Sequence, residues 1–419
     1  MKTTRLFILL WASGLSLPSF ANSFIDDSSV KLNTRNYYLD RDFTDFEALP
    51  GARDWAQGFI FTASSGYTPG TIGLGLDLQS LTSVKLKGDA KYLPSGLLPT
   101  DAQSRERSDT ATEIGLTAKA KYQNTELKLG TLQPWTPVIF SSPSRLLPQT
   151  FRGAMLNSKD LSAFTLTAGY IDRVNHRDST NYERMTNIGF NQRFKVAEID
   201  DFSFVGGEYS WSDQSKIGLY HALADDVYQQ SALTFNNTTP ISADAKLSTN
   251  IRVWHSHDTG QSLAGKIDNT LSTANLGLSL DNHRLTLSGM HNHGQTAHPY
   301  LSGGEVLIFI DGWSTDFLNP KERVYGLRYD YDFKDFVPGL KFMTRYTRGN
   351  HIQLPNLGGD KLKEDSLDFD LQYSLQTGVL KGLGLRARYA KYDNNFAQNA
   401  SFKPANETRF NMDYTWTFK

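Results

Sequence analysis

The segment RFNMDYTWTFK, residues Arg409 to Lys419, closes the chain with a strict alternation of polar and apolar side chains. Side chains of a β-strand point to opposite faces with a period of two, so one face of this strand is aromatic and the other is polar. The aromatic face carries Phe410, Met412, Tyr414, Trp416 and Phe418. A transmembrane β-barrel suits both faces, because lipid surrounds the barrel and its lumen is polar.

The same alternation recurs along the chain, and no amphipathic helix interrupts it. Alternating segments cover residues 72–78, 113–122, 275–287, 327–333, 340–346 and 367–373. Short turns such as Asp335–Gly339 alternate with long polar loops at residues 87–110, 132–153, 173–187 and 291–323, as in outer-membrane barrels. A strand with its connection takes roughly 20 to 24 residues, which predicts about 16 to 20 antiparallel strands in an all-β barrel.

The N-terminus has the pattern of a secretory signal peptide over residues 1–21. Lys2 and Arg5 precede an apolar run over residues 6–17, and a small-residue cleavage motif ends at Ala21. We therefore expect one barrel domain over residues 22–419. The chain has no cysteine, which excludes disulfides and thiolate metal sites. Its formal net charge of −1 gives no indication of nucleic-acid binding.

Basic residues occur on the polar faces of strands at both ends of the chain. Arg386 and Arg388 share one face, Arg409 opens the last strand, and Arg35 lies near the first. The last strand of a closed barrel pairs with the first, so these guanidinium groups are predicted to line one wall of the lumen. Such a column would attract anions and pass them from one group to the next. The alternative is that these arginines are solvated, or paired with acids such as Asp370 and Asp413.

The loop over residues 132–153 differs from the other loops in composition. It contains four prolines, three aromatic residues, and the basic residues Arg145 and Arg152. Prolines stiffen a chain and aromatic side chains pack against their surroundings. We expect this loop to fold into the lumen and to constrict it; the alternative is an external loop packed against its neighbours.

Several stretches resemble the OprD family of outer-membrane substrate-specific channels. They run in order over nearly the whole chain after residue 34: RNYYLDRDF (35–43), WAQGF (55–59), GYTPGTIGLGLD (66–77), GLTAKAKYQNTELKLGTLQP (115–134), SRLLPQTFRG (144–153), RDSTNYE (177–183), DGWSTDFLN (311–319), LRYDYDF (327–333) and VPGLKFMTRYTRGN (337–350). The resemblance implies an 18-stranded barrel in the outer membrane of a Gram-negative bacterium. It also implies that the third extracellular loop folds inward, with help from the fourth, to form a narrow eyelet.

The family takes up small carboxylate-bearing nutrients along a ladder of basic residues, and the motifs locate candidates for these roles here. The resemblance places Arg145 and Arg152 in the constricting loop, and Arg35, Arg386, Arg388 and Arg409 in the ladder. Asp311 and Ser314 become candidates for the opposing wall. An acidic wall suits basic amino acids, whereas an aromatic eyelet suits benzoate-like acids, and the residues do not decide between these substrates.

Other functions remain as alternatives. A general diffusion porin would have the same barrel with a wider eyelet, and a structural or adhesin barrel would be blocked. We expect no enzyme activity, no cofactor and no metal site, although His255 and His257 have a spacing that zinc sites use. Expected partners are small carboxylates, outer-membrane lipid and the barrel-assembly machinery, with a monomer or a loose homotrimer as the assembled state.

Overall fold

The computed structural model describes residues 22–45, 49–308, 310 and 312–419. The expected signal peptide lies outside the described residues. Eighteen strands form one closed antiparallel sheet, which confirms the predicted all-β barrel. They are β1 Ser29–Phe43, β2 Ala52–Ser64, β3 Gly73–Gly88, β4 Thr110–Tyr122, β5 Thr125–Leu132, β8 Thr150–Ser158, β9 Phe164–Asn175, β12 Phe202–Ser212, β13 Ser215–Ala224, β14 Tyr228–Pro240, β15 Ala245–Asp258, β16 Asp268–Leu280, β17 His283–Gly294, β18 Arg323–Asp332, β19 Leu340–Leu354, β20 Gly359–Ser374, β21 Gly384–Asn394 and β22 Ala405–Thr417.

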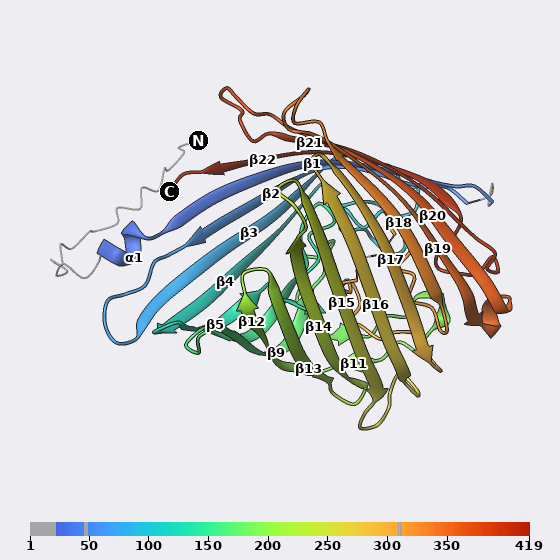
Figure 1. Ribbon diagram of the computed structural model, residues 1–419, viewed down its shortest axis with the longest axis horizontal. Coiled ribbons are helices and arrows are strands. Elements are labelled where there is room, and N and C mark those ends of the chain that lie inside the picture. Colours follow the sequence, from blue (N-terminus) through green and yellow to red (C-terminus); the bar gives the residue numbers. More distant parts are fainter. Residues whose placement is uncertain (1–21, 46–48, 309, 311) are drawn as a thin grey trace, which may run out of the picture.

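Each strand pairs with the next one in the chain, and β22 closes the barrel by pairing with β1 (Figure 1). In this seam Arg35 lies opposite Asp413, Tyr37 opposite Asn411, and Leu39 opposite Arg409. The pairing brings the basic residues of both chain ends onto one wall, as the sequence predicts. Closure also leaves no unpaired strand edge.

The outward face of the wall is apolar over its middle. One row of paired residues runs across β16 to β20: Leu276, Leu287, Leu327, Tyr346 and Leu367. Four of these side chains are exposed and Leu367 is partly exposed, although the inward residues between them are polar or charged. An apolar band around a polar lumen is the arrangement that crosses an outer membrane. None of the helices in the described part of the chain has the length and hydropathy needed to span a membrane.

The minor elements are not part of the barrel wall; they precede β1 or lie in the connections between strands. They are the helix α1 Asn22–Asp26, the hairpins β6 Trp135–Thr136 with β7 Ile139–Phe140 and β10 Met185–Thr186 with β11 Glu198–Ile199, and the 3₁₀ turns η2 Phe190–Gln192 and η3 Pro355–Leu357. The Asp335–Gly339 turn between β18 and β19 lies where the sequence predicts it.

Three long connections at the end of the barrel away from the termini matter for the lumen. We name them L3 (residues 133–149, between β5 and β8), L4 (residues 176–201, between β9 and β12) and L7 (residues 295–322, between β17 and β18). The proline-rich loop is shorter than its predicted range of 132–153, because β8 already begins at Thr150.

These connections bring the main hydrophobic core inside the barrel. Its largest cluster joins L3, L4 and L7 to the inner wall of the strands from β5 to β18; buried members include Leu132, Ile139, Phe151, Ile188, Trp254, Leu301, Ile310 and Phe317. A second cluster packs Leu146 and Leu147 of L3 against Tyr37, Leu39, Ala56 and Leu81 of β1 to β3. Burial of this apolar surface holds the loops inward, so the long-loop half of the lumen is narrow.

Candidate functional site

L3 is tethered to the seam of the barrel by Arg35. The Arg35 guanidinium donates to the carbonyl oxygens of Pro143, at 3.0 Å, and Arg145, at 2.7 Å, and it forms an ion pair with Asp413 at 2.5 Å. The Trp254 indole of the opposite wall donates to the Pro137 carbonyl at 2.9 Å. L3 is therefore fixed at both sides of the lumen, as a constriction requires.

The loop carries the Arg145 side chain into a group of positive charges. Burial and the neighbouring guanidinium groups of Arg409 and Arg177 lower the pKa of Arg145. Among the described residues, no carboxylate lies within ion-pair distance of Arg145, although its side chain is only partly exposed. A cation with this environment is stabilised by an anion that binds beside it.

The predicted ladder lies on the inner wall, but most of its members have partners. Arg386 pairs with Asp370 at 2.5 Å and Arg409 pairs with Glu407, which also binds Arg41. Together with the Arg35–Asp413 pair, these contacts agree with the alternative that the arginines are salt-bridged. The wall therefore carries fewer uncompensated charges than the count of arginines suggests.

Arg388 is the member of the ladder that binds neutral groups. It is buried, and its guanidinium donates to the Asn411 side chain at 2.6 Å and to the Tyr37 hydroxyl at 3.1 Å. Its Nε has no hydrogen-bond partner among the described residues. The same guanidinium lies 5.5 Å from the ring of Trp313 in L7, a distance typical of cation–π contact. Arg388 thus links the wall to the aromatic side of the constriction.

L7 contacts both the arginine wall and L3 at the constriction. The Arg409 guanidinium donates to the Trp313 carbonyl at 2.6 Å, and Glu305 accepts from the Ser144 hydroxyl of L3 at 2.5 Å. Ser314 is buried, and its hydroxyl has no partner within the described part of the chain. Asp311, the acidic candidate for this wall, lies outside the described residues.

Arg152 does not join this group. It lies in β8, where the preceding Phe151 points into the hydrophobic cluster inside the barrel. Arg152 consequently points to the other face of the sheet, where it is about half exposed and pairs with Asp172 of β9. Its prediction as a residue of the constricting loop is not supported by this position, because β8 begins before Arg152 and the strand alternation turns the side chain outward.

Two features of the constriction had no counterpart in the sequence-based prediction. Arg177 of L4 approaches Arg145, and no ion pair of the described residues involves Arg177. L4 and L7 are joined by a buried, bidentate ion pair in which Arg193 binds Asp316 through two contacts of 2.7 Å. The only sequence signal for Arg177 was its place in the RDSTNYE stretch, which says nothing about the direction of the loop.

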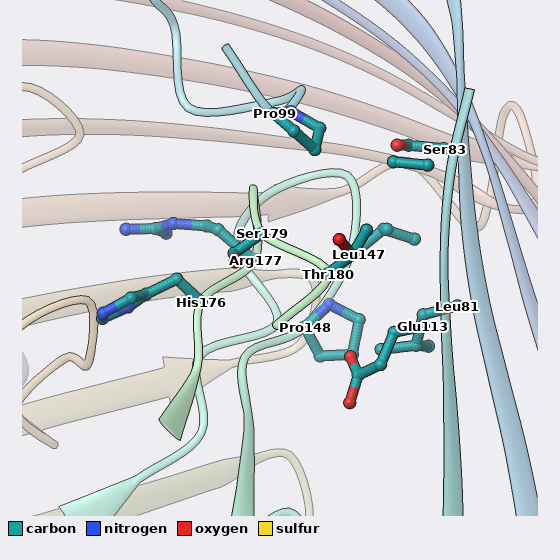
Figure 2. A pocket seen from close by; sticks show the side chains of 11 residues that line it. Leu81, Ser83, Pro99, Glu113, Leu147, Pro148, His176, Arg177, Ser179 and Thr180 are labelled. Atoms are coloured by element: carbon teal, nitrogen blue, oxygen red, sulfur yellow. The ribbon is translucent and has the colours of Figure 1, made fainter. Parts of the chain in front are cut away.

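A pocket behind the constriction is too small for a substrate. Figure 2 shows it between the C-terminal end of L3 and the start of L4, with Pro99, Leu147, Pro148 and His176 among its lining residues. Its volume of about 10 Å³ has room for a single water molecule. The Ser83 hydroxyl on its wall is buried without a partner among the described residues, and a water molecule would satisfy it.

The described residues contain no group of three His, Asp or Glu side chains that could hold a metal ion. The chemistry of the site is therefore that of guanidinium groups, hydroxyls and aromatic rings around a narrow passage. This arrangement binds and orients anions but offers no activated nucleophile.

Comparison with known proteins supports the interpretation of the chain as an outer-membrane channel. The family model "outer membrane porin, OprD family" matches residues 22–418. The crystal structure of Acinetobacter baumannii OccAB2 has 51% sequence identity and a TM-score of 0.91, and the match covers 95% of this chain and 100% of that chain. Pseudomonas aeruginosa OpdK with vanillate has 32% identity and a TM-score of 0.86, with 94% and 100% covered. Pseudomonas aeruginosa OccK2 (OpdF) in complex with glucuronate has 31% identity and a TM-score of 0.84, with 95% and 100% covered.

The match spans essentially the whole barrel and includes the stretches quoted above. The protein therefore belongs to the OprD family of outer membrane porins, as a non-enzymatic, substrate-specific channel of the Gram-negative outer membrane.

Proposed function

We propose that this channel admits small monocarboxylic acids that carry no positive charge, and that Arg145 is the residue that binds their carboxylate at the constriction. Arg177 and Arg409 lie beside Arg145, and Arg177, which has no ion pair among the described residues, strengthens the attraction. Arg35 positions the loop rather than binding the substrate, because its donors are used by L3 carbonyls and Asp413.

The observation that carries this proposal is that Arg145 has no counter-ion among the described residues. The other wall arginines with carboxylate partners are already neutralised, so an incoming anion gains less from them. At Arg145 an anion would replace water beside a poorly solvated cation and could accept bidentate hydrogen bonds.

The charges of the described constriction also favour acids over basic amino acids. Among the described residues, Arg145, Arg177 and Arg388 form no ion pair, although Asp370 acts on Arg388 from a distance, and the carboxylate of Glu407 is held by Arg409 and Arg41. A second positive charge on the substrate would be repelled. The ring of Trp313, which is partly exposed beside Arg388, offers contact to an apolar or aromatic substituent. The vanillate bound to OpdK and the glucuronate bound to OccK2 are both monocarboxylic acids without a positive charge.

The remaining expectations about partners belong to the same proposal. Outer-membrane lipid would contact the outward apolar band, and the barrel-assembly machinery would insert the chain after removal of residues 1–21. The assembled state would be a monomer or a loose homotrimer.

Uptake by proteoliposomes tests the proposal with three solutes: benzoate, arginine and an uncharged sugar. We expect saturable entry of benzoate, with little entry of arginine or sugar. Saturable entry of arginine in preference to benzoate would contradict the proposal that the substrates carry no positive charge. Equal and non-saturating entry of all three would show that the constriction does not select carboxylates.

A further inference from the structure

A second cavity lies in the lumen wall on the side of L7 that faces the short turns. It has a volume of about 260 Å³, and it is enclosed by inward-facing residues of β15 to β19 and by Ile310 of L7. Its polar lining consists of Asn250, Asn275, Arg284, Thr286, Ser288, Arg328 and Arg345. None of these residues belongs to the constriction described above.

The hollow exists because glycine occupies two inward positions of the wall. Gly326 of β18 lies between Ser288 and Thr347 in one row of the sheet, and an added Cβ there would meet only ordinary contacts of 3.4 Å or more. Gly277 of β16 leaves space for the Arg284 side chain, because a Cβ at this position would lie 2.8 Å from its guanidinium. Arg284 crosses Gly277 and donates to the Ser248 hydroxyl at 2.8 Å.

Three arginines line the cavity, and two of them are paired with carboxylates. Asp281, Asp332 and Asp370 line the adjoining hollow that shares Arg284 and Arg328. Arg328 pairs with Asp330, and Arg345 pairs with Asp368, each at 2.6 Å. Asp330 lies opposite Arg284 in the sheet, but its carboxylate is directed to Arg328. Among the described residues, no carboxylate lies within ion-pair distance of Arg284.

Neutral hydrogen-bonding groups line up beside these charges. Asn250, Asn275 and Ser288 occupy consecutive strands of one row and all face the cavity. The side-chain oxygen of Asn275 is buried and has no partner within the described part of the chain. A buried acceptor without a partner favours a ligand that brings a hydroxyl donor.

We propose that this cavity is a second anion site, which binds hydroxylated carboxylic acids such as sugar acids after they pass the constriction. Arg284, with Arg328 beside it, takes the carboxylate, and Asn250, Asn275 and Ser288 take the hydroxyls. This inference rests on the proposed uptake of carboxylates and goes beyond it, because it gives the wall from β15 to β19 a role in selecting among acids. An acid without hydroxyls gains only the weaker charge attraction there.

The test compares uptake of gluconate and benzoate by proteoliposomes that contain the wild type or the variant Arg284→Gln. Loss of a charge-assisted hydrogen bond at a partly solvated site corresponds to an increase of about fivefold to tenfold in KM for gluconate. Benzoate uptake should change less than twofold. Lys246→Gln is the matched control, because Lys246 is an exposed cation on the same wall and does not line the cavity.

A second variant tests whether the position of the Arg284 guanidinium matters when its charge is kept. Gly277→Ala keeps Arg284 but moves its guanidinium, so it should raise the gluconate KM in the same direction, with benzoate again unchanged. Heat-resistant migration on gels and β-sheet circular dichroism show whether each variant has assembled. For assembled variants, an unchanged gluconate KM, or an equal loss for gluconate and benzoate, would overturn the second site.

The two proposals fail in distinguishable ways. If wild-type channels show no saturable entry of either acid, the proposed function itself is wrong and the second site falls with it. If both acids enter saturably, and Arg145→Gln impairs both while Arg284→Gln has no selective effect on gluconate, only the second site is wrong.

Discussion

Arg35 contributes to the channel by holding a loop in place. Its guanidinium bridges the β1–β22 seam and two carbonyl oxygens of L3, so one side chain connects barrel closure to the position of Arg145. Carbonyl oxygens bound in this way are satisfied only while the loop stays inside the lumen. The residue therefore acts through the geometry of L3.

The variant Arg35→Gln should loosen L3 without abolishing the attraction for anions. Loss of two hydrogen bonds to a charged donor costs about 3–6 kcal/mol of loop stability. We expect increased leakage of an uncharged sugar and noisier single-channel currents, with benzoate uptake still saturable. Lys31→Gln provides the control, because Lys31 is exposed on the same face of β1. Sugar leakage that is equal in the two variants would show that Arg35 does not hold the loop.

At the level of single residues, the sequence located the wall arginines and, as an alternative to free guanidinium groups, two of their partners, Asp370 and Asp413. Strand alternation places Arg35, Arg386, Arg388 and Arg409 on inward faces with little ambiguity. Which of them remains uncompensated depends on cross-strand register, which pairs Arg386 with Asp370 and leaves Arg388 on Tyr37 and Asn411. Arg145 and Arg177 depend on loop conformation, for which the chain has no periodic signal.

The three loops act as one element, and the Arg193–Asp316 pair is the strongest link between L4 and L7. The Arg193 side chain is fully buried, and it also donates to the Asn319 side chain at 3.0 Å and 2.8 Å. Breaking a buried pair from one side leaves an uncompensated charge, which costs about 3–5 kcal/mol.

Asp316→Ala should therefore release L7 from L4 and widen the passage. We expect a higher single-channel conductance and faster amide hydrogen exchange in residues 295–322, with the barrel strands unaffected. Asp172→Ala breaks the exposed Arg152–Asp172 pair and serves as the control, since exposed pairs contribute about 0–1 kcal/mol. Slow exchange in L7 of the Asp316→Ala protein would show that the loop is held by its apolar contacts alone.

L7 also contains a buried histidine that couples its packing to pH. Burial lowers the pKa of His298 to about 3. The ring packs 5.7 Å from that of Trp254 and faces the Gln230 side chain, while Asp316 and Arg193 act on it with opposite signs. An exposed histidine titrates near 6.5, so the stability provided by neutral His298 is present above that pH and is lost as the pH falls toward 3.

This linkage predicts that L7 opens more readily in acid. At pH 5 the stability lost through His298 is about 2 kcal/mol. Hydrogen exchange in residues 295–322, corrected for intrinsic rates, should therefore be faster at pH 5 than at pH 7. Burial and the nearby Glu364 carboxyl raise the pKa of Glu322 in the same loop, which acts in the opposite direction. Comparison with His298→Asn isolates the histidine, because Glu322 is common to both proteins. A variant with the same pH response as the wild type would refute the role of His298.

For the whole molecule, the barrel could be predicted and the filling of its lumen could not. Alternation in each strand, the short turns and the absence of cysteine all follow from a wall between lipid and water, so strand positions were set by local pattern. The inward folding of L3 was expected from the family resemblance and its stiff composition. The contributions of L4 and L7 depend on tertiary contacts such as the packing of Ile188, Leu301 and Ile310. These contacts correspond to no periodic pattern in the sequence.

The whole molecule is thus a closed wall whose narrow half is built from three loops and carries unneutralised guanidinium groups. The two proposed sites would differ in what they recognise: Arg145 would bind the carboxylate of every substrate, whereas the cavity at Arg284 would distinguish acids by their hydroxyls. Selectivity for carboxylates should then depend on one loop residue more than on any member of the paired ladder.

The most direct test of this account is the saturable uptake of benzoate by proteoliposomes containing Arg145→Gln. Because the variant loses a charged, bidentate contact, benzoate uptake at low substrate concentration should fall at least about tenfold, with sugar entry unchanged. Arg152→Gln is the matched control, because it removes an arginine seven positions away that faces outward. Benzoate uptake that is unchanged in Arg145→Gln, or reduced equally in Arg152→Gln, would contradict the claim that Arg145 selects the substrate.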